Sequence, residues 1–233
     1  MKSILYLFPV PLGDENSKNV VPAFNIELLN EIEYVIAENA KTARKWMKLM
    51  GCGKNLQEYE YSELNEHTKE SELLEIVKPL VDGKITAYLS EAGCPGIADP
   101  GSKLVSFCHT KGIKVVPLIG PSSILLALIS SGLNGQSFAF NGYLPREKND
   151  RIKKLREIEK SISRQNQTQI FIETPYRNNA VLEDMLTQLH PDTKLCIASN
   201  LTLPSQKITT RSIAHWKKHP PSLDKIPAVF LLG

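Results

Sequence analysis

The stretch best suited to chemistry is a loop at residues 90–101, where carboxylates are interleaved with glycine and proline. A short run rich in strand-forming residues, 85–89, ends abruptly before it. Three glycines and two prolines then fall within nine residues, and the loop also carries Glu91 and Asp99. Glycine lets a ligand approach the backbone closely, and proline fixes the shape of a loop. Open α/β sheets bind ligands beyond the carboxyl ends of their strands, so this loop is predicted to line a ligand site.

A second turn of the same kind follows at residues 120–123, Gly-Pro-Ser-Ser. It comes after a predicted strand at 114–119 and opens a very apolar helix at 124–131. Ser122 is a suitable helix cap, and free amides at a helix start can bind a polar ligand group. We therefore expect this turn to contribute to the same site.

Several common sites are excluded because their motifs are missing. No GxGxxG follows the first strand and no GxxxxGK[ST] occurs, which argues against ordinary dinucleotide and nucleoside triphosphate binding. No histidine pair has metal spacing and no GxSxG occurs, so neither a metal site nor a nucleophilic serine is expected. The four cysteines form no CxxC pair and fit reduced thiols in a cytosolic protein.

The elements that must position these loops alternate regularly up to residue 131. Each of five strands is followed by a helix, and this order predicts a mostly parallel sheet with right-handed crossovers. Asn39 is predicted to cap the second helix, and Trp46 within it is expected to pack in the core. The predicted strands are 4–10, 34–37, 58–64, 85–89 and 114–119; the predicted helices are 22–32, 40–50, 68–81, 102–111 and 124–131.

The second part of the chain is organised differently. Strands are predicted at 138–140, 169–173 and 194–199, helices at 146–164 and 178–189, and an antiparallel pair of strands at 207–212 and 228–232. We therefore expect an α/β protein of two α/β domains, 1–118 and 119–233, without a flexible linker. The N-terminal domain should hold a mostly parallel five-stranded sheet and the C-terminal domain a mixed sheet.

Charge is distributed unevenly between these two parts. The net charge is only +3, yet residues 1–139 hold 13 Lys and Arg against 16 Asp and Glu, and residues 140–233 hold 15 against 9. The predicted helix 146–164 carries eight basic and four acidic residues. It can be a solvated surface helix or can contact phosphates, in which case Lys148, Arg151, Lys153 and Lys154 would bind RNA.

No apolar run approaches the ~20 residues that span a bilayer. The short apolar run near the N-terminus is interrupted by Pro9 and Pro11, so it is interpreted as a buried strand rather than a signal peptide. No membrane association is expected.

Residues 90–101, SEAGCPGIADPG, resemble the signature S-D-A-G-T-P-x-I-S-D-P-G of the tetrapyrrole (corrin/porphyrin) methylase superfamily, in its branch acting on ribosomal RNA. Three further stretches are similar to that branch: 120–123 with 131–133 to G-P-S-A…S-G-L, 140–145 to F-x-G-F-L-P, and 173–177 to E-S-P-H-R. The first two motifs together are quite specific. The resemblance runs from about residue 4 to about residue 203.

This resemblance implies a homodimeric, cytoplasmic enzyme of two α/β domains with S-adenosylmethionine (SAM) folded into the cleft between them. The branch methylates the 2′-hydroxyl of a cytidine in small-subunit ribosomal RNA, so ribosomal RNA or the small ribosomal subunit is the implied partner. The family's cofactor contacts carry over to Pro11, Glu91, Ala92, Gly93, Ile97, Ser122, Ser123 and, more loosely, Ala198.

The sequence departs from the branch at charged positions rather than in the cofactor loops. The family's P-x-G-N-L is PLGDE at 11–15, its A-E-D-T-R-x-T-R is AENAKTAR at 37–44, and its A-R-E-L-T-K is ASNLTL at 198–203. Three interpretations therefore stay open. They are methylation of ribosomal RNA, methylation of a tetrapyrrole or other small molecule, and binding of SAM or RNA without turnover.

A methyltransferase needs its acceptor aligned with the methyl group and the sulfur, and a ribose hydroxyl benefits from a general base. The candidates are Glu38, Glu91 and Asp99, which the sequence does not rank. Asp99 is equally well explained as a carboxylate that braces the loop.

Overall fold

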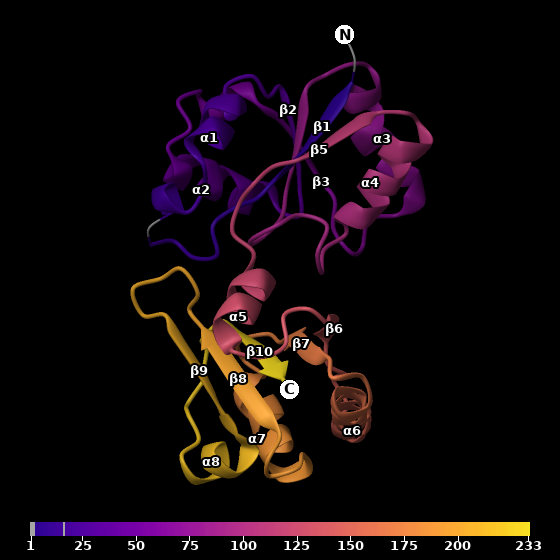
Figure 1. The fold of residues 1–233 in the computed structure, drawn as a ribbon. Helices are drawn as coiled ribbons and strands as arrows, with labels where there is room; N and C mark the ends of the chain where they lie inside the picture. The colour runs from indigo at the N-terminus through magenta and orange to yellow at the C-terminus, as the bar shows by residue number, and fades with distance from the viewer. Residues whose placement is uncertain (1–2, 16) are drawn as a thin grey trace. The chain divides into compact units, whose positions relative to one another are not determined.

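The computed structural model describes residues 3–15 and 17–233, and the chain separates into two compact units between Ser122 and Ser123 (Figure 1). Among the described residues, no helix combines the length and apolarity needed to cross a membrane.

The first unit contains a five-stranded sheet in the order β3-β2-β4-β1-β5, and every pairing in it is parallel. This confirms the parallel sheet predicted from the strand–helix alternation. Its strands are β1 (Ile4–Phe8), β2 (Tyr34–Ala37), β3 (Glu60–Glu63), β4 (Thr86–Leu89) and β5 (Lys114–Pro117).

Helices cover both faces of this sheet, with α1 (Ala23–Leu29) and α2 (Ala40–Met50) on one face and α3 (Glu70–Val81) and α4 (Gly101–Thr110) on the other (Figure 1). Two short 3-10 helices, Ser17–Asn19 and Leu56–Glu58, lie in the connections. Side chains alternate between the faces of a strand. Phe8 of β1 therefore packs with α1 and α2, and Leu5 packs with α3 and α4. Asn39 caps α2 as predicted, accepting hydrogen bonds from the N–H groups of Lys41 and Thr42.

Because all five strands are parallel, the loops that follow them meet at one edge of the sheet. Residues 9–13 follow β1, residues 38–39 follow β2, residues 90–100 follow β4 and residues 118–122 follow β5. The fold thus gathers most of the residues that the sequence marked for chemistry at the carboxyl edge of this sheet.

The second unit contains a mixed five-stranded sheet in the order β6-β7-β10-β8-β9. Only β6 and β7 are parallel, and the other three pairings are antiparallel. The strands are β6 (Phe138–Tyr143), β7 (Thr168–Ile172), β8 (Lys194–Ser199), β9 (Lys207–Ser212) and β10 (Ala228–Leu232).

One prediction about this sheet was wrong. Strands 207–212 and 228–232 do not pair with each other, because β8 lies between them and is antiparallel to both. β8 and β9 are joined by a short connection and form a hairpin, and the completely buried β10 then inserts between β7 and β8. The segment between β9 and β10 also holds a helix that the sequence did not predict, α8 (Ile213–Lys218).

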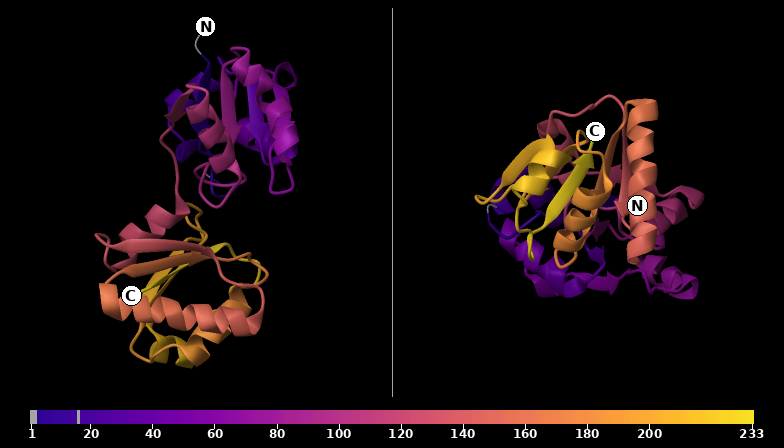
Figure 2. Two further views of the ribbon diagram at one scale, coloured as in Figure 1. Left: turned by 90° about the vertical axis from the view of Figure 1, so that its right-hand side faces the viewer. Right: turned by 90° about the horizontal axis from the view of Figure 1, so that it is seen from below.

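The main core of this unit lies between the sheet and three helices: α6 (Lys148–Gln165), α7 (Asn178–Gln188) and α8. Figure 2 shows α6 running beside the sheet. Phe171 of β7 stacks on Phe230 of β10 at the centre of this core, with ring centroids 5.5 Å apart. The alternate residues Val229 and Leu231 face the other side, where α5 (Ser123–Ser131) packs against β8, β9 and β10.

Candidate functional site

The loops after β1 and β4 are joined directly. Val10 and Gly93 form an isolated antiparallel bridge in which each N–H donates to the other's carbonyl, at 2.9 and 3.1 Å. Gly93 has φ of 72°, and a Cβ on it would lie 3.1 Å from Cδ2 of Leu12. The positive φ therefore favours glycine here, and a Cβ would also press on the Leu12 side chain. The bridge brings Pro11 next to the central loop.

Trp46 of α2 fixes the start of the central loop. Its indole Nε1–H donates to the carbonyl of Glu91 at 2.9 Å, while the ring is only 5% exposed and lies among the core residues. The predicted core role of Trp46 is confirmed. The hydrogen bond to Glu91 is an additional role, and no sequence signal indicated it because the two residues are far apart in the chain.

Two of the three candidate bases hold backbone N–H groups of this loop. Oε1 of Glu38 accepts from the N–H of Glu91 at 3.2 Å. Asp99 accepts from the N–H of Gly96, at 2.9 Å to Oδ1 and 2.8 Å to Oδ2, and from the N–H of Gly101 at 2.7 Å. Asp99 therefore does brace the loop, as one of its two interpretations predicted.

Both of these carboxyl groups have a raised pKa, which favours their protonated form. Burial raises the pKa of Asp99, against the opposing effect of its backbone hydrogen bonds and the Tyr88 hydroxyl. Burial is also the main cause that raises the pKa of Glu38, and the nearby charges of Asp99, Glu91 and Glu66 raise it further. A carboxylate with a raised pKa is a stronger base, which suits either residue to proton abstraction.

Gly101 begins α4, and its backbone passes close to the ring of Tyr88. A Cβ on Gly101 would lie 2.3 Å from Cε1 of Tyr88 and 2.8 Å from Oδ1 of Asp99. The Tyr88 side chain is fully buried, so it has no room to move aside. The sequence predicted that glycine in this loop lets a ligand approach the backbone, whereas the structure shows that Gly101 makes room for the Tyr88 ring.

The outer part of the loop has strained backbone. Ala98 has φ of 59° and Gly96 has φ of 85°. A non-glycine residue in the left-handed region costs about 1–2 kcal/mol. Asp99, adjacent to Ala98, supplies the hydrogen bonds that hold this conformation. Such strain often occurs where a loop is shaped for a ligand.

The turn after β5 packs on the other two loops. A Cβ on Gly120 would lie 2.3 Å from Cβ of Pro9, and Sγ of Cys94 lies 3.4 Å from the carbonyl oxygen of Pro121. Asn25 of α1 donates to the carbonyl of Ile119 at 2.8 Å. Three loops that are distant in sequence thus form one connected surface at the carboxyl edge.

The residues predicted to bind cofactor differ in exposure. Glu91, Ala92 and Ile97 are exposed, with Ile97 at 46%, whereas Pro11, Gly93 and Ser122 are buried. Ser123 and Ala198 belong to the second unit, where Ser123 begins α5. Ala198 lies in β8 between β10 and β9 and is fully buried. Its side chain is packed within the sheet, and its contact with the cofactor stays a prediction.

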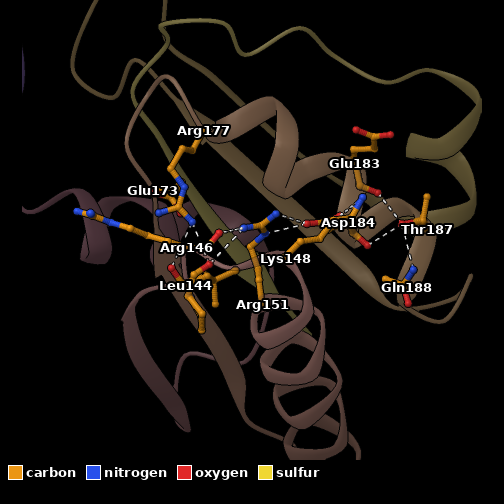
Figure 3. A network of polar contacts seen from close by, with 11 residues as sticks. Leu144, Arg146, Lys148, Arg151, Glu173, Arg177, Glu183, Asp184, Thr187 and Gln188 are labelled. Carbon is orange, nitrogen blue, oxygen red and sulfur yellow. Dashed lines mark hydrogen bonds and ion pairs between the residues drawn. The ribbon is translucent and has the colours of Figure 1, made fainter.

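In the second unit, Arg151 is not placed as predicted. Its side chain is 8% exposed, and its Nε and Nη2 both lie 2.7 Å from Oδ2 of Asp184, whose side chain is 3% exposed (Figure 3). A guanidinium enclosed in this way does not contact phosphate, so Arg151 is removed from the candidate RNA-binding residues. A signal was available: Arg151, Leu155 and Ile158 lie on one stripe of α6, at positions i, i+4 and i+7.

The three lysines among the candidate RNA-binding residues are accessible. Lys148 is 67% exposed, with its Nζ 3.7 Å from Oδ1 of Asp184. Lys153 is exposed and Lys154 is half-buried. These positions leave phosphate contact open for all three.

A separate cleft of about 600 Å³ lies in the first unit, between the start of α3 and one side of α4. It contains none of the residues predicted to bind cofactor; its lining includes Lys69, Leu73, Lys103 and Phe107.

Comparison with protein families gives a match to the model for "Tetrapyrrole (Corrin/Porphyrin) Methylases" over residues 24–216. Among curated proteins, the chain is 34% identical over 211 residues to "Ribosomal RNA small subunit methyltransferase I" of Vibrio cholerae, covering 91% of this chain and 69% of that protein. It is 32% identical over 220 residues to the protein of the same name from Halalkalibacterium halodurans, covering 93% of this chain and 72% of that one.

Among solved structures, the fold is similar to the crystal structure of the methyltransferase CobJ, with a TM-score of 0.65 and 17% identity over 100% of this chain and 94% of that chain. It is also similar to uroporphyrin-III-C-methyltransferase from Thermus thermophilus, with a TM-score of 0.57 and 16% identity over the same shares. At these identities, the likeness establishes the two-domain α/β fold alone.

Proposed function

Because the chain belongs to the tetrapyrrole (corrin/porphyrin) methylase family, we propose that it is a SAM-dependent methyltransferase acting on a ribose 2′-hydroxyl in small-subunit ribosomal RNA. The observation that carries the choice of substrate is the similarity, at 34% and 32% identity over more than nine-tenths of the chain, to proteins named for that activity. The solved tetrapyrrole enzymes are only 12–17% identical.

The residues at the carboxyl edge of the first unit fit SAM. Ala92 is exposed, and its N–H has no acceptor within residues 3–15 and 17–233, so it can donate to a ligand. The exposed Ile97 offers an apolar contact, and Glu91 a carboxylate for an amine or hydroxyl groups. Pro11, Gly93 and Ser122 would shape the surface beneath them. When bound, SAM supplies a methyl group already activated by its positive sulfur. The residues of the protein then bind SAM, orient the acceptor and deprotonate its hydroxyl group.

Of the three candidate bases, we favour Glu38. Both oxygens of Asp99 bind backbone N–H groups, whereas the hydrogen bond of Glu38 uses only Oε1. The Oε2 of Glu38 is then the better placed acceptor for a proton from a ribose hydroxyl. Glu38→Gln should lower kcat by about 10²–10⁴-fold and leave the SAM dissociation constant within about 3-fold. Loss of SAM binding with unchanged kcat would assign Glu38 to the loop instead.

The exposed side chains of Lys148 and Lys153, with Lys154, would bind phosphates of the RNA. Each phosphate contact to a single strand adds about −0.7 to the slope of log K against log salt concentration. Replacing all three lysines with alanine should make that slope shallower by about 2, while SAM affinity stays unchanged. An unaltered slope would leave α6 as a solvated surface helix.

The deciding experiment supplies radiolabelled SAM and three acceptors: small ribosomal subunits from cells lacking this protein, total RNA, and a precorrin-type tetrapyrrole. Label in the subunit RNA, mapped by primer extension to a ribose, supports the proposal. Label in the tetrapyrrole alone would replace it with small-molecule methylation. Tight SAM binding by calorimetry without transfer to any acceptor would indicate a binding protein, an outcome that the altered charged positions make worth testing.

We also propose a cytoplasmic homodimer, as the family resemblance implies. The second unit exposes apolar side chains on α5, namely Leu125 at 52% and Ile129 at 78%, and such a surface favours association. Light scattering after gel filtration should give twice the mass of the chain. Ile129→Glu should reduce that mass, and a wild-type mass of one chain would contradict the dimer.

A further inference from the structure

The loop that follows β6 is held by two arginines that bind its carbonyl groups. Arg151 donates from Nη1 to the carbonyl of Pro145 at 3.3 Å and to that of Arg146 at 2.7 Å. Arg177 donates from Nη2 to the carbonyls of Leu144 and Pro145, at 3.4 and 3.0 Å. Three consecutive carbonyls are thus fixed from two directions.

Both arginines are in turn held by buried carboxylates. Arg151 pairs with Asp184 as described above, and Nη2 of Arg177 lies 3.1 Å from Oε2 of Glu173, whose side chain is fully buried. Oε1 of Glu173 also accepts from the N–H of Thr174 at 2.7 Å. Glu173 follows β7 and Arg146 follows β6, and these strands are parallel. The loops therefore meet at one edge.

The side chain of Arg146 takes no part in this network. Figure 3 shows it directed away from the other labelled residues. It is exposed, and its guanidinium has no ion-pair or hydrogen-bond partner among the described residues. A rigid backbone thus presents a solvated guanidinium, so binding an anion costs less ordering than it would on a mobile loop.

An exposed aromatic ring lies at the same edge. Tyr176 precedes Arg177 and is 78% exposed, although its neighbour is tied to the carbonyls of Leu144 and Pro145. A phenol exposed to this extent gains little from packing in the protein. Proteins that bind single-stranded nucleic acid combine cations on the backbone with aromatic rings on which bases stack.

We propose that this edge of the second unit binds a single-stranded segment of the RNA substrate. Arg146 binds a phosphate and Tyr176 stacks on an adjacent base. Arg151 and Arg177 are positioning residues that hold the loop, and they do not touch the RNA. The inference rests on the proposed function, and it goes further by naming the surface and the strandedness of the substrate there.

The surface is not simply positive, because Glu147 and Asp150 follow Arg146 and are also exposed. A general electrostatic attraction would therefore be weak here. Binding should depend on the exact position of Arg146 and on the ring of Tyr176.

The test measures binding of a fluorescein-labelled, mixed-sequence, single-stranded 12-nucleotide RNA by anisotropy at several salt concentrations. Arg146→Ala should weaken binding about 10-fold and make the salt slope shallower by about 0.7. Tyr176→Ala should weaken binding about 5- to 100-fold with an unchanged slope, and Tyr176→Phe should restore it. The matched control is Arg164→Ala, at an exposed arginine in the last turn of α6, which should bind like wild type.

A double-mutant cycle tests the positioning role. Arg151→Gln should weaken RNA binding in the wild-type background and have no further effect on it in Arg146→Ala, while lowering thermal stability in both. Additive effects on binding would overturn the positioning role.

Failure of the inference is distinguishable from failure of the proposed function. If wild type methylates small subunits but Arg146→Ala and Tyr176→Ala bind the 12-mer like wild type, or wild type does not bind it, this surface is not the RNA site and the function stands. If wild type neither binds the RNA nor methylates subunits, both fall.

Discussion

Both units use the carboxyl edge of parallel strands, but they brace the loops there with opposite charges. In the first unit, the carboxylates of Glu38 and Asp99 accept hydrogen bonds from backbone N–H groups. In the second, the guanidinium groups of Arg151 and Arg177 donate to backbone carbonyls. The charged groups left exposed beside these loops also differ, because the first unit exposes the carboxylate of Glu91 and the second exposes the guanidinium of Arg146. The first arrangement suits a cationic cofactor, and the second suits a polyanion.

The largest test of this comparison removes the cation that braces the second unit. Arg151→Met leaves Asp184 buried without its partner, and breaking a buried ion pair in this way costs about 3–5 kcal/mol. The control is Lys148→Met, because that exposed lysine lies near the same carboxylate and should contribute less than about 1 kcal/mol.

Unfolding can be followed for each unit separately, because the chain has two tryptophans and Trp46 and Trp216 lie in different units. In a Trp46→Phe background, Trp216 fluorescence in urea reports on the second unit. Replacing Asp184 with Leu in the Arg151→Met chain should recover most of the loss, since no charge is then left buried. Equal losses for Arg151→Met and Lys148→Met would contradict the bracing role of Arg151.

The next effect tests whether the first unit is braced by packing as well as by charge. Gly101→Ala places a methyl group against Tyr88 and Asp99, and overpacking of this kind costs about 1–3 kcal/mol. In a Trp216→Phe background, Trp46 fluorescence measures that loss, and calorimetry should show weaker SAM binding. Gly53→Ala is the control in the same unit, because its Cβ would lie 3.6 Å from Oδ1 of Asn30, an ordinary contact distance. If Gly101→Ala is destabilised but binds SAM with unchanged affinity, the loop does not contribute to cofactor binding.

A smaller effect comes from the two indole N–H groups. Trp46→Phe removes the hydrogen bond to the carbonyl of Glu91, and Trp216→Phe removes one of the same length, 2.9 Å, to the carbonyl of Leu195. Each should cost about 1 kcal/mol in thermal or urea unfolding followed by circular dichroism. Only Trp46→Phe should also weaken SAM binding, by a few-fold. A similar loss of SAM affinity in Trp216→Phe would indicate a general loss of stability rather than a local effect on the loop.

Most of the first unit could be predicted from local patterns, because strand–helix alternation and the Asn39 cap are encoded by neighbouring residues. The position of β10 could not be predicted in this way. The sequence of a strand does not show which strands it will pair with, and β8 lies between β10 and β9. The burial of Arg151 was available from the apolar stripe of α6, yet its charge suggested the surface. The bond from Trp46 to Glu91 depends on tertiary packing alone.

The smallest effect concerns the pH dependence of stability in the first unit. Burial raises the pKa of Asp99 above its usual value of about 4. The folded state therefore favours the protonated form, and this stabilisation is complete below the unfolded pKa and is lost as pH rises through the folded pKa.

Asparagine does not titrate, and without the charge of Asp99 the pKa of Glu38 should be raised less. Asp99→Asn should lose a constant amount of stability, because its hydrogen bonds to Gly96 and Gly101 are weaker. Added to this constant loss, its stability relative to wild type should rise as pH increases from about 3.5 to about 7. Urea unfolding at a series of pH values checks this. A difference that grows in favour of wild type with rising pH would mean that hydrogen bonding to the charged carboxylate outweighs its burial, which would make Asp99 a stronger brace and a weaker base.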